Sequence, residues 1–241
     1  MSTNQKSSTS VPHAPEAPRP ADVRTFWRVL LAVVAPLPMA GLGAYYLLTP
    51  VDGGAPLEST VAAYAADPVR AELLPYLQVP FLFIVPAVFA VVWVSRRRAP
   101  RLTTVGALIA LTGFLVGFGT IGGIVAPATL AAKYQLNVAA LGELERAMME
   151  SPIALVGSLL FILGVTVGLL LLGLAMWRSH AAPAWMGIAL AFGGFTHPFM
   201  PGHLAAGIGL LVAAVGFAGA SRALLRWADD DFDLPPLPRV A

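Results

Sequence analysis

The sequence predicts an all-α protein, a polytopic bundle of six transmembrane helices, and three observations lead to this fold class. Hydrophobic residues make up 57% of the 241 residues and charged residues only 12%, whereas a soluble domain is about 25% charged. Apolar stretches of about 20 residues recur along the chain, and each can cross a hydrocarbon core of ~30 Å. Lys and Arg concentrate in alternate connections between these stretches, which predicts a multi-pass protein of the cell membrane.

The apolar stretches divide the chain into a tail over residues 1–25, a transmembrane domain over 26–224 and a second cytoplasmic tail over 225–241. The first tail is rich in Ser, Pro and Thr without apolar periodicity, and it is expected to be disordered. The expected spans are residues 29–48, 76–94, 102–126, 153–177, 183–199 and 204–224. A cleaved signal peptide is the alternative for the first stretch, but no small-residue cleavage site follows it. Residues 137–150 predict a short interfacial helix.

The basic residues predict an orientation with both termini in the cytoplasm. With six alternating spans, 12 of the 15 Lys and Arg fall on the cytoplasmic side, and only Arg70, Lys133 and Arg146 fall outside. This is the positive-inside bias. The tryptophans and the tyrosines are expected on opposite sides of the membrane. All five tryptophans lie near the expected cytoplasmic ends, and all five tyrosines lie at outer ends or in outer connections.

The prediction of a full membrane crossing is weakest for the fifth stretch, residues 183–199. It is short, and Pro198 and Pro201 bracket its end. The alternative is a re-entrant helical hairpin, which would leave five elements and an outward C-terminal tail. The arginines after the sixth stretch favour six spans.

The chain also contains a suggested internal repeat of two helical hairpins. The pattern Trp93…Ser95…Ala99-Pro100 is similar to Trp177…Ser179…Ala182-Pro183, at an offset near 84 residues. Both hairpins would enter from outside, so the repeat would be parallel, with a pseudo-twofold axis along the membrane normal. Coincidence within sequence rich in Gly, Ala and Leu is the alternative.

Charged groups are missing from the cores of the expected spans. No Asp, Glu, Lys or Arg lies there, and such residues normally mark ion paths and proton relays. This weighs against a proton-coupled pump but leaves a facilitator or a lipid-handling protein open. The absence of cysteine excludes disulfides and thiolate sites. We find no nucleic-acid signature and predict no cofactor.

The candidate ligand site is the pair His197 and His203, which flank a proline-rich turn at the expected outer face. Two neutral imidazoles across such a turn can converge on one metal ion. Two ligands do not complete a zinc site, so Glu143, Glu145 or Glu150 would have to join them. The alternative is that both histidines cap helix ends.

Glycines at helical spacing predict close contacts between helices. Three pairs fit the small-xxx-small pattern: Gly113 and Gly117, Gly119 and Gly123, and Gly164 and Gly168. A dimer seam or a groove for lipid is the alternative use of these faces.

The order of several features resembles uncharacterised six-span bacterial integral membrane proteins. The matching residues are the loop Arg96–Arg98, the glycine-rich stretch Val105–Phe114, and Gly164–Trp177, which ends in Trp-Arg. The resemblance covers roughly residues 55–220. It implies a six-span fold and carries no activity with it.

Two classes of function follow from these patterns. The first is a non-enzymatic membrane protein that binds a small molecule or a lipid, or that serves as an accessory to other membrane proteins. The second is a facilitative transporter or permease subunit without intramembrane charge. An enzyme comes third, because no catalytic group is visible at membrane depth. The expected partners are the lipid bilayer and a second membrane protein or a second copy of the chain.

Overall fold

The computed structural model describes residues 22–52, 55–121, 127–200 and 202–233, and within these ranges the chain forms helices and no strand. The predicted all-α class is confirmed. The elements in chain order are α1 (Arg24–Val34), α2 (Leu37–Leu48), α3 (Leu57–Ala66), α4 (Pro68–Leu73), the 3-10 helix η1 (Leu74–Phe83), α5 (Ile84–Ser95), α6 (Pro100–Ile121), α7 (Pro127–Tyr134), α8 (Val138–Met149), α9 (Pro152–Leu163), the π-helix η2 (Gly164–Gly168), α10 (Leu169–Ser179), α11 (Ala184–Gly193), α12 (Thr196–Phe199), α13 (His203–Arg226) and α14 (Asp229–Phe232).

Five helical stretches are long and apolar enough to cross a membrane. They coincide with five of the six predicted spans, and each begins between one and eight residues earlier than the sequence predicts. They are Arg24–Leu48, Pro68–Ser95, Pro100–Gly119, Pro152–Ser179 and His203–Arg226. Five long apolar helices make the chain compatible with a membrane protein.

The predicted fifth span is the exception. Helix α11 has ten residues and α12 has four, and a turn at Gly194 and Phe195 separates them. This stretch is too short to count with the other five. It nevertheless packs tightly inside the bundle: an added Cβ at Gly173 of α10 would lie 2.4 Å from the Gly187 oxygen, and one at Gly216 of α13 would lie 2.4 Å from the Leu190 nitrogen.

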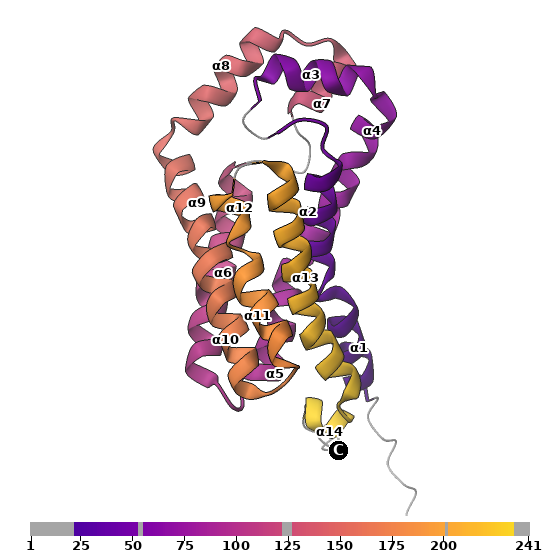
Figure 1. Cartoon of the computed structure of the whole chain (residues 1–241), viewed down its shortest axis with the longest axis vertical. Helices are drawn as coiled ribbons and strands as arrows, with labels where there is room; N and C mark the ends of the chain where they lie inside the picture. Colours follow the sequence, from indigo (N-terminus) through magenta and orange to yellow (C-terminus); the bar gives the residue numbers. More distant parts are fainter. Residues whose placement is uncertain (1–21, 53–54, 122–126, 201, 234–241) are drawn as a thin grey trace, which may run out of the picture.

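The beginning of α1 and the C-terminal helix α14 lie at the same end of the bundle (Figure 1). Arg24 Nη1 donates to Asp230 Oδ1 at 2.6 Å, and Arg28 Nε donates to Asp229 Oδ1 at 3.0 Å. Hydrogen bonds from Thr25 and Arg28 hold the pKa of Asp229 below its usual value. These contacts join two segments about 200 residues apart in the chain.

The acidic segment after α13, within the range 225–241 that the sequence predicts as a cytoplasmic tail, packs against the bundle as far as it is described. Phe232 is only 4% exposed and belongs to the main hydrophobic core. The indole Nε1 of Trp93 donates to the Phe232 carbonyl at 2.7 Å, and the two rings lie 5.4 Å apart. The sequence pattern misses this because four acidic residues surround the single phenylalanine.

Four short helices, α3, α4, α7 and α8, cover the opposite end of the bundle (Figure 1), and we call them the cap. Arg70 Nε of α4 donates to the Leu48 carbonyl at 2.6 Å. This gives a hydrogen-bond donor to a carbonyl at the C-terminal end of α2 that has no partner within the helix. Lys133 of α7 pairs with Glu72 of α4 at 3.3 Å. The short helix predicted over 137–150 is confirmed as α8, where Asn137 Oδ1 accepts from the Ala140 N–H.

Two of the three predicted glycine pairs form close helix contacts. An added Cβ at Gly113 would lie 2.4 Å from the Leu160 oxygen and 2.6 Å from Gly164 Cα, and one at Gly168 would lie 2.7 Å from Ala110 Cα. Helix α6 therefore crosses α9 and η2 at backbone distance. Gly119, in contrast, has open space around it, and its predicted partner Gly123 lies outside the described residues.

Candidate functional site

A small cavity of about 260 Å³ lies between the cap and the end of the bundle. The top of α2, the loop after it, the cap helices α3, α7 and α8, and the first residue of α13 all contribute to its wall. Its lining combines hydroxyl, imidazole and carboxylate groups with apolar ones: Tyr45, Tyr46, Thr49, Val51, Asp52, Ala55, Leu57, Thr60, Tyr64, Pro127, Ala128, Glu145 and His203. The cavity is thus a polar pocket at the edge of an apolar bundle.

The start of α13 holds His203 in the wall of this cavity. The His203 N–H donates to Asp52 Oδ1 at 2.9 Å, which places a carboxylate where the helix N-terminus carries partial positive charge. The residue before it, Gly202, has φ of 91°, a left-handed conformation that glycine adopts without strain. A glycine at this position lets the chain turn sharply from α12 into α13.

The structure brings both predicted histidines to one side chain, Tyr46. The ring of His197 lies 5.0 Å from the Tyr46 ring, and that of His203 lies 5.2 Å from it, both in edge-on geometry. The Nδ1 atoms of both histidines are buried, and within the described part of the chain neither has a hydrogen-bond partner. Of the two histidines, His203 lines the small cavity, whereas His197 is not among its lining residues.

One of the three glutamates proposed from the sequence lies in the wall of the small cavity. Glu145 lines the small cavity together with His203, but Glu143 and Glu150 are exposed and lie outside its lining. Among the residues that the structure describes, no group of three or more His, Asp or Glu side chains is placed to hold a metal ion. Metal binding by His197 and His203 stays a prediction, and Asp52 is the nearby acid that the sequence pattern did not suggest.

A second and larger cavity of about 700 Å³ opens on the other side of α3 and α7. Its lining is mainly apolar, with the Glu72 and Lys133 pair beside it. The lining residues are Tyr64, Ala65, Pro68, Ala71, Glu72, Pro75, Tyr76, Val79, Thr129, Leu130, Ala132, Lys133, Tyr134 and Gln135.

Tyr64 belongs to the walls of both cavities. It is 3% exposed, and Tyr45 packs against the buried cluster to which it belongs. Burial raises the pKa of Tyr64 to about 12, so the phenol stays neutral over the physiological range. Each of the five tyrosines of the chain lines at least one of the two cavities. The placement of all five tyrosines at outer ends of the predicted spans or in outer connections is the sequence pattern that coincides with these cavities.

Comparisons with models of protein families, with curated proteins and with solved structures produced no match. The resemblance to six-span bacterial membrane proteins therefore stays a prediction. The function must be argued from the cavities and from the side chains that line them.

Proposed function

We propose that the chain is an integral membrane protein that binds a single-chain amphiphile, with its polar part in the small cavity and its apolar part in the large one. The observation that carries this proposal is the set of five tyrosines around the two cavities. A phenol offers a large apolar face and one hydrogen-bonding group. Such side chains suit a ligand that is itself apolar over most of its length and polar at one end.

The dimensions and the chemistry of the two cavities agree with this ligand class. The larger volume, about 700 Å³, falls within the usual range of roughly 300–1,000 Å³ for small-molecule sites. The smaller cavity supplies Asp52, Glu145 and the unpartnered Nδ1 of His203 for a polar headgroup. No catalytic step is needed to explain these groups.

The proposal includes six membrane crossings with both termini in the cytoplasm. The pairing of Arg24 with Asp230 supports an even number of crossings, because the chain leaves the bundle at the end where it enters. An even number of crossings requires one more membrane-crossing segment besides the five long stretches. Helices α11 and α12 fit that part, since they connect the end of α10 to the start of α13 at the opposite end of the bundle (Figure 1). A re-entrant hairpin would not bring the two chain ends together.

Cysteine labelling tests this topology, because the chain contains no cysteine of its own. In intact spheroplasts, a membrane-impermeant maleimide should label Ala139→Cys on the exposed cap helix α8. It should leave Ala228→Cys, which is also exposed, unlabelled until the membrane is opened. Labelling of Ala228→Cys in intact spheroplasts would contradict the proposed orientation.

Photo-crosslinking tests the binding site. We expect a diazirine-bearing fatty acid, added to the protein in phosphatidylcholine nanodiscs, to attach mainly to α4, η1 and α7. Ala132 lines the large cavity and is half-buried, so Ala132→Phe should fill the space and lower crosslinking there by about tenfold. A loss of that size corresponds to about 1.4 kcal/mol of binding free energy.

Ala139→Phe is the matched control, because it places the same ring on exposed α8 outside both cavities. Crosslinking in this variant should equal that of the parent protein. Crosslinks spread evenly over outward-facing residues such as Leu115 and Leu159 would indicate ordinary bilayer contact and would refute the binding site.

A facilitative transporter is the second candidate, and one observation favours it. Three of the five long stretches depart from continuous α-helix: a turn at Ala35 and Pro36 divides the first, η1 contains Pro80, and η2 is a π-helix in which the Thr166 hydroxyl donates to the Ile162 carbonyl. Interrupted helices often mark substrate paths in transporters. The cysteine labelling separates the two candidates: Thr166→Cys should stay unlabelled from both sides in a binding protein and should react in a transporter.

A further inference from the structure

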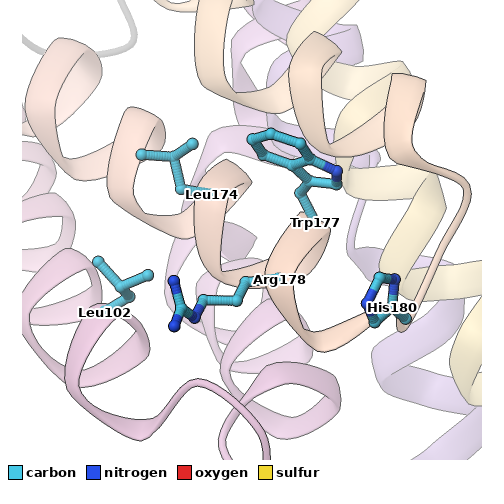
Figure 2. A pocket seen from close by; sticks show the side chains of 5 residues that line it. All are labelled: Leu102, Leu174, Trp177, Arg178 and His180. Atoms are coloured by element: carbon cyan, nitrogen blue, oxygen red, sulfur yellow. The ribbon is translucent and has the colours of Figure 1, made fainter.

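A third cavity, of about 370 Å³, lies near the end of the bundle that carries the chain termini, far from the cap. Figure 2 shows its lining: Leu102 from the first turn of α6, and Leu174, Trp177, Arg178 and His180 from α10 and the turn after it. The Arg178 side chain extends toward Leu102, so the guanidinium bridges the space between the two helices (Figure 2).

Close packing deeper in the bundle creates this groove. An added Cβ at Gly106 would lie 2.9 Å from Leu171 Cβ and 3.1 Å from the Leu172 nitrogen, so α6 and α10 meet at backbone distance there. One turn closer to the chain termini, the cavity lies between Leu102 of α6 and the end of α10. The Arg98 Nη1 bonds the Ser179 carbonyl at 3.1 Å and holds the two helix ends together below it.

The guanidinium in the groove belongs to Arg178. Arg178 is exposed, and among the described residues it makes no ion pair. Three acids at this end, Asp22, Asp229 and Asp230, pair with the arginines of α1. An external anion could therefore pair with Arg178 in the groove.

The surrounding side chains give the depth at which this anion would lie. Trp177 is 48% exposed, and an amphipathic indole at a helix end prefers the headgroup region of a membrane. Above it, Val105 of α6 is exposed and Ile109 is half-buried on the same face as Leu102. The groove thus offers positive charge at headgroup depth and an apolar strip toward the bilayer centre.

We propose that the groove between α6 and α10 binds an anionic phospholipid, with its phosphate against Arg178 and its acyl chains along α6. Basic pockets between membrane helices recognise such headgroups. The first turn of α6 adds the partial positive charge of a helix N-terminus. This site is separate from the cap cavities, and it rests only on the insertion of the bundle into a membrane.

Native mass spectrometry of the full chain released from nanodiscs tests this site. With discs of phosphatidylcholine and phosphatidylglycerol, the protein should retain phosphatidylglycerol selectively. Arg178→Gln should weaken that retention about fivefold, since one basic residue near a membrane surface contributes about a factor of five in affinity. Arg226→Gln is the matched control, because Arg226 is exposed at the same end but lies outside the groove.

Three outcomes would overturn the proposal: equal retention of the two lipids, an equal loss in both variants, or competition by free glycerol phosphate at the same concentration. The last result would identify a soluble anion as the occupant. Failure of the protein to enter nanodiscs would instead refute membrane insertion itself. The crosslinking experiment at the cap cavities is a separate measurement. Its result therefore does not depend on which lipid the groove retains.

Discussion

Replacing Gly113 with leucine should destabilise the protein more than any other single substitution on α6. The new Cβ would lie 2.4 Å from the Leu160 oxygen and 2.6 Å from Gly164 Cα, and neither backbone atom can move without displacing α9 or η2. Overpacking of this kind costs about 3 kcal/mol. We therefore expect the apparent melting temperature of the detergent-solubilised protein, followed by size-exclusion chromatography after heating, to fall by roughly 10 °C.

Gly119→Leu is the control for this experiment, because Gly119 has no neighbouring atom within 4 Å of an added Cβ. It lies on the same helix, and leucine is a better helix former than glycine by about 0.8 kcal/mol. Its melting temperature should be unchanged or slightly higher. Similar losses in both variants would mean that the backbone contact between α6 and η2 is not what stabilises the bundle.

The glycine pattern shows what sequence alone can and cannot predict in this fold. Spacing of four residues correctly marked Gly113 and Gly164 as contact positions, because only a missing side chain lets two helices approach so closely. It could not show that the two glycines meet each other, since that depends on how α6 and α9 are placed in space. Gly119 has the same spacing, but in the described structure no atom lies within 4 Å of an added Cβ there.

The positions of the apolar spans could also be predicted, because they depend on the local sequence. Hydropathy over about 20 residues is a property of the local sequence, and five of the six stretches agree with long helices. The extra length of Pro68–Ser95 was missed, because the polar pair Arg70 and Glu72 lies in its first turns. Tertiary contacts with Leu48 and Lys133 hold these two residues in the cap.

The sequence predicted that His197 and His203 converge on one metal ion, and metal binding stays a prediction. In the structure the rings of both histidines pack against a common partner. The partner itself, Tyr46, comes from a helix more than 150 residues earlier, and no local pattern identifies it. Glu143 was a candidate because of its position in the sequence, but the orientation of α8 leaves it exposed outside the cavity.

The second large effect is expected at the other end of the bundle, where Phe232→Ala should weaken the attachment of the C-terminal segment. Phe232 is 4% exposed, and its ring packs against Trp93 at 5.4 Å between centroids. Removing a buried phenylalanine ring costs about 3 kcal/mol through lost burial and the cavity left behind. The melting temperature should therefore fall about as far as in Gly113→Leu.

Phe26→Ala provides the comparison, because Phe26 lies on α1 at the same end of the bundle but is 60% exposed. It should leave the melting temperature nearly unchanged. A chain that ends at Ala228 should lose at least as much stability as Phe232→Ala, since Arg24 and Arg28 then lose Asp230 and Asp229 as partners. If both the truncated chain and Phe232→Ala melt like the parent protein, the packing of α14 makes no contribution to stability.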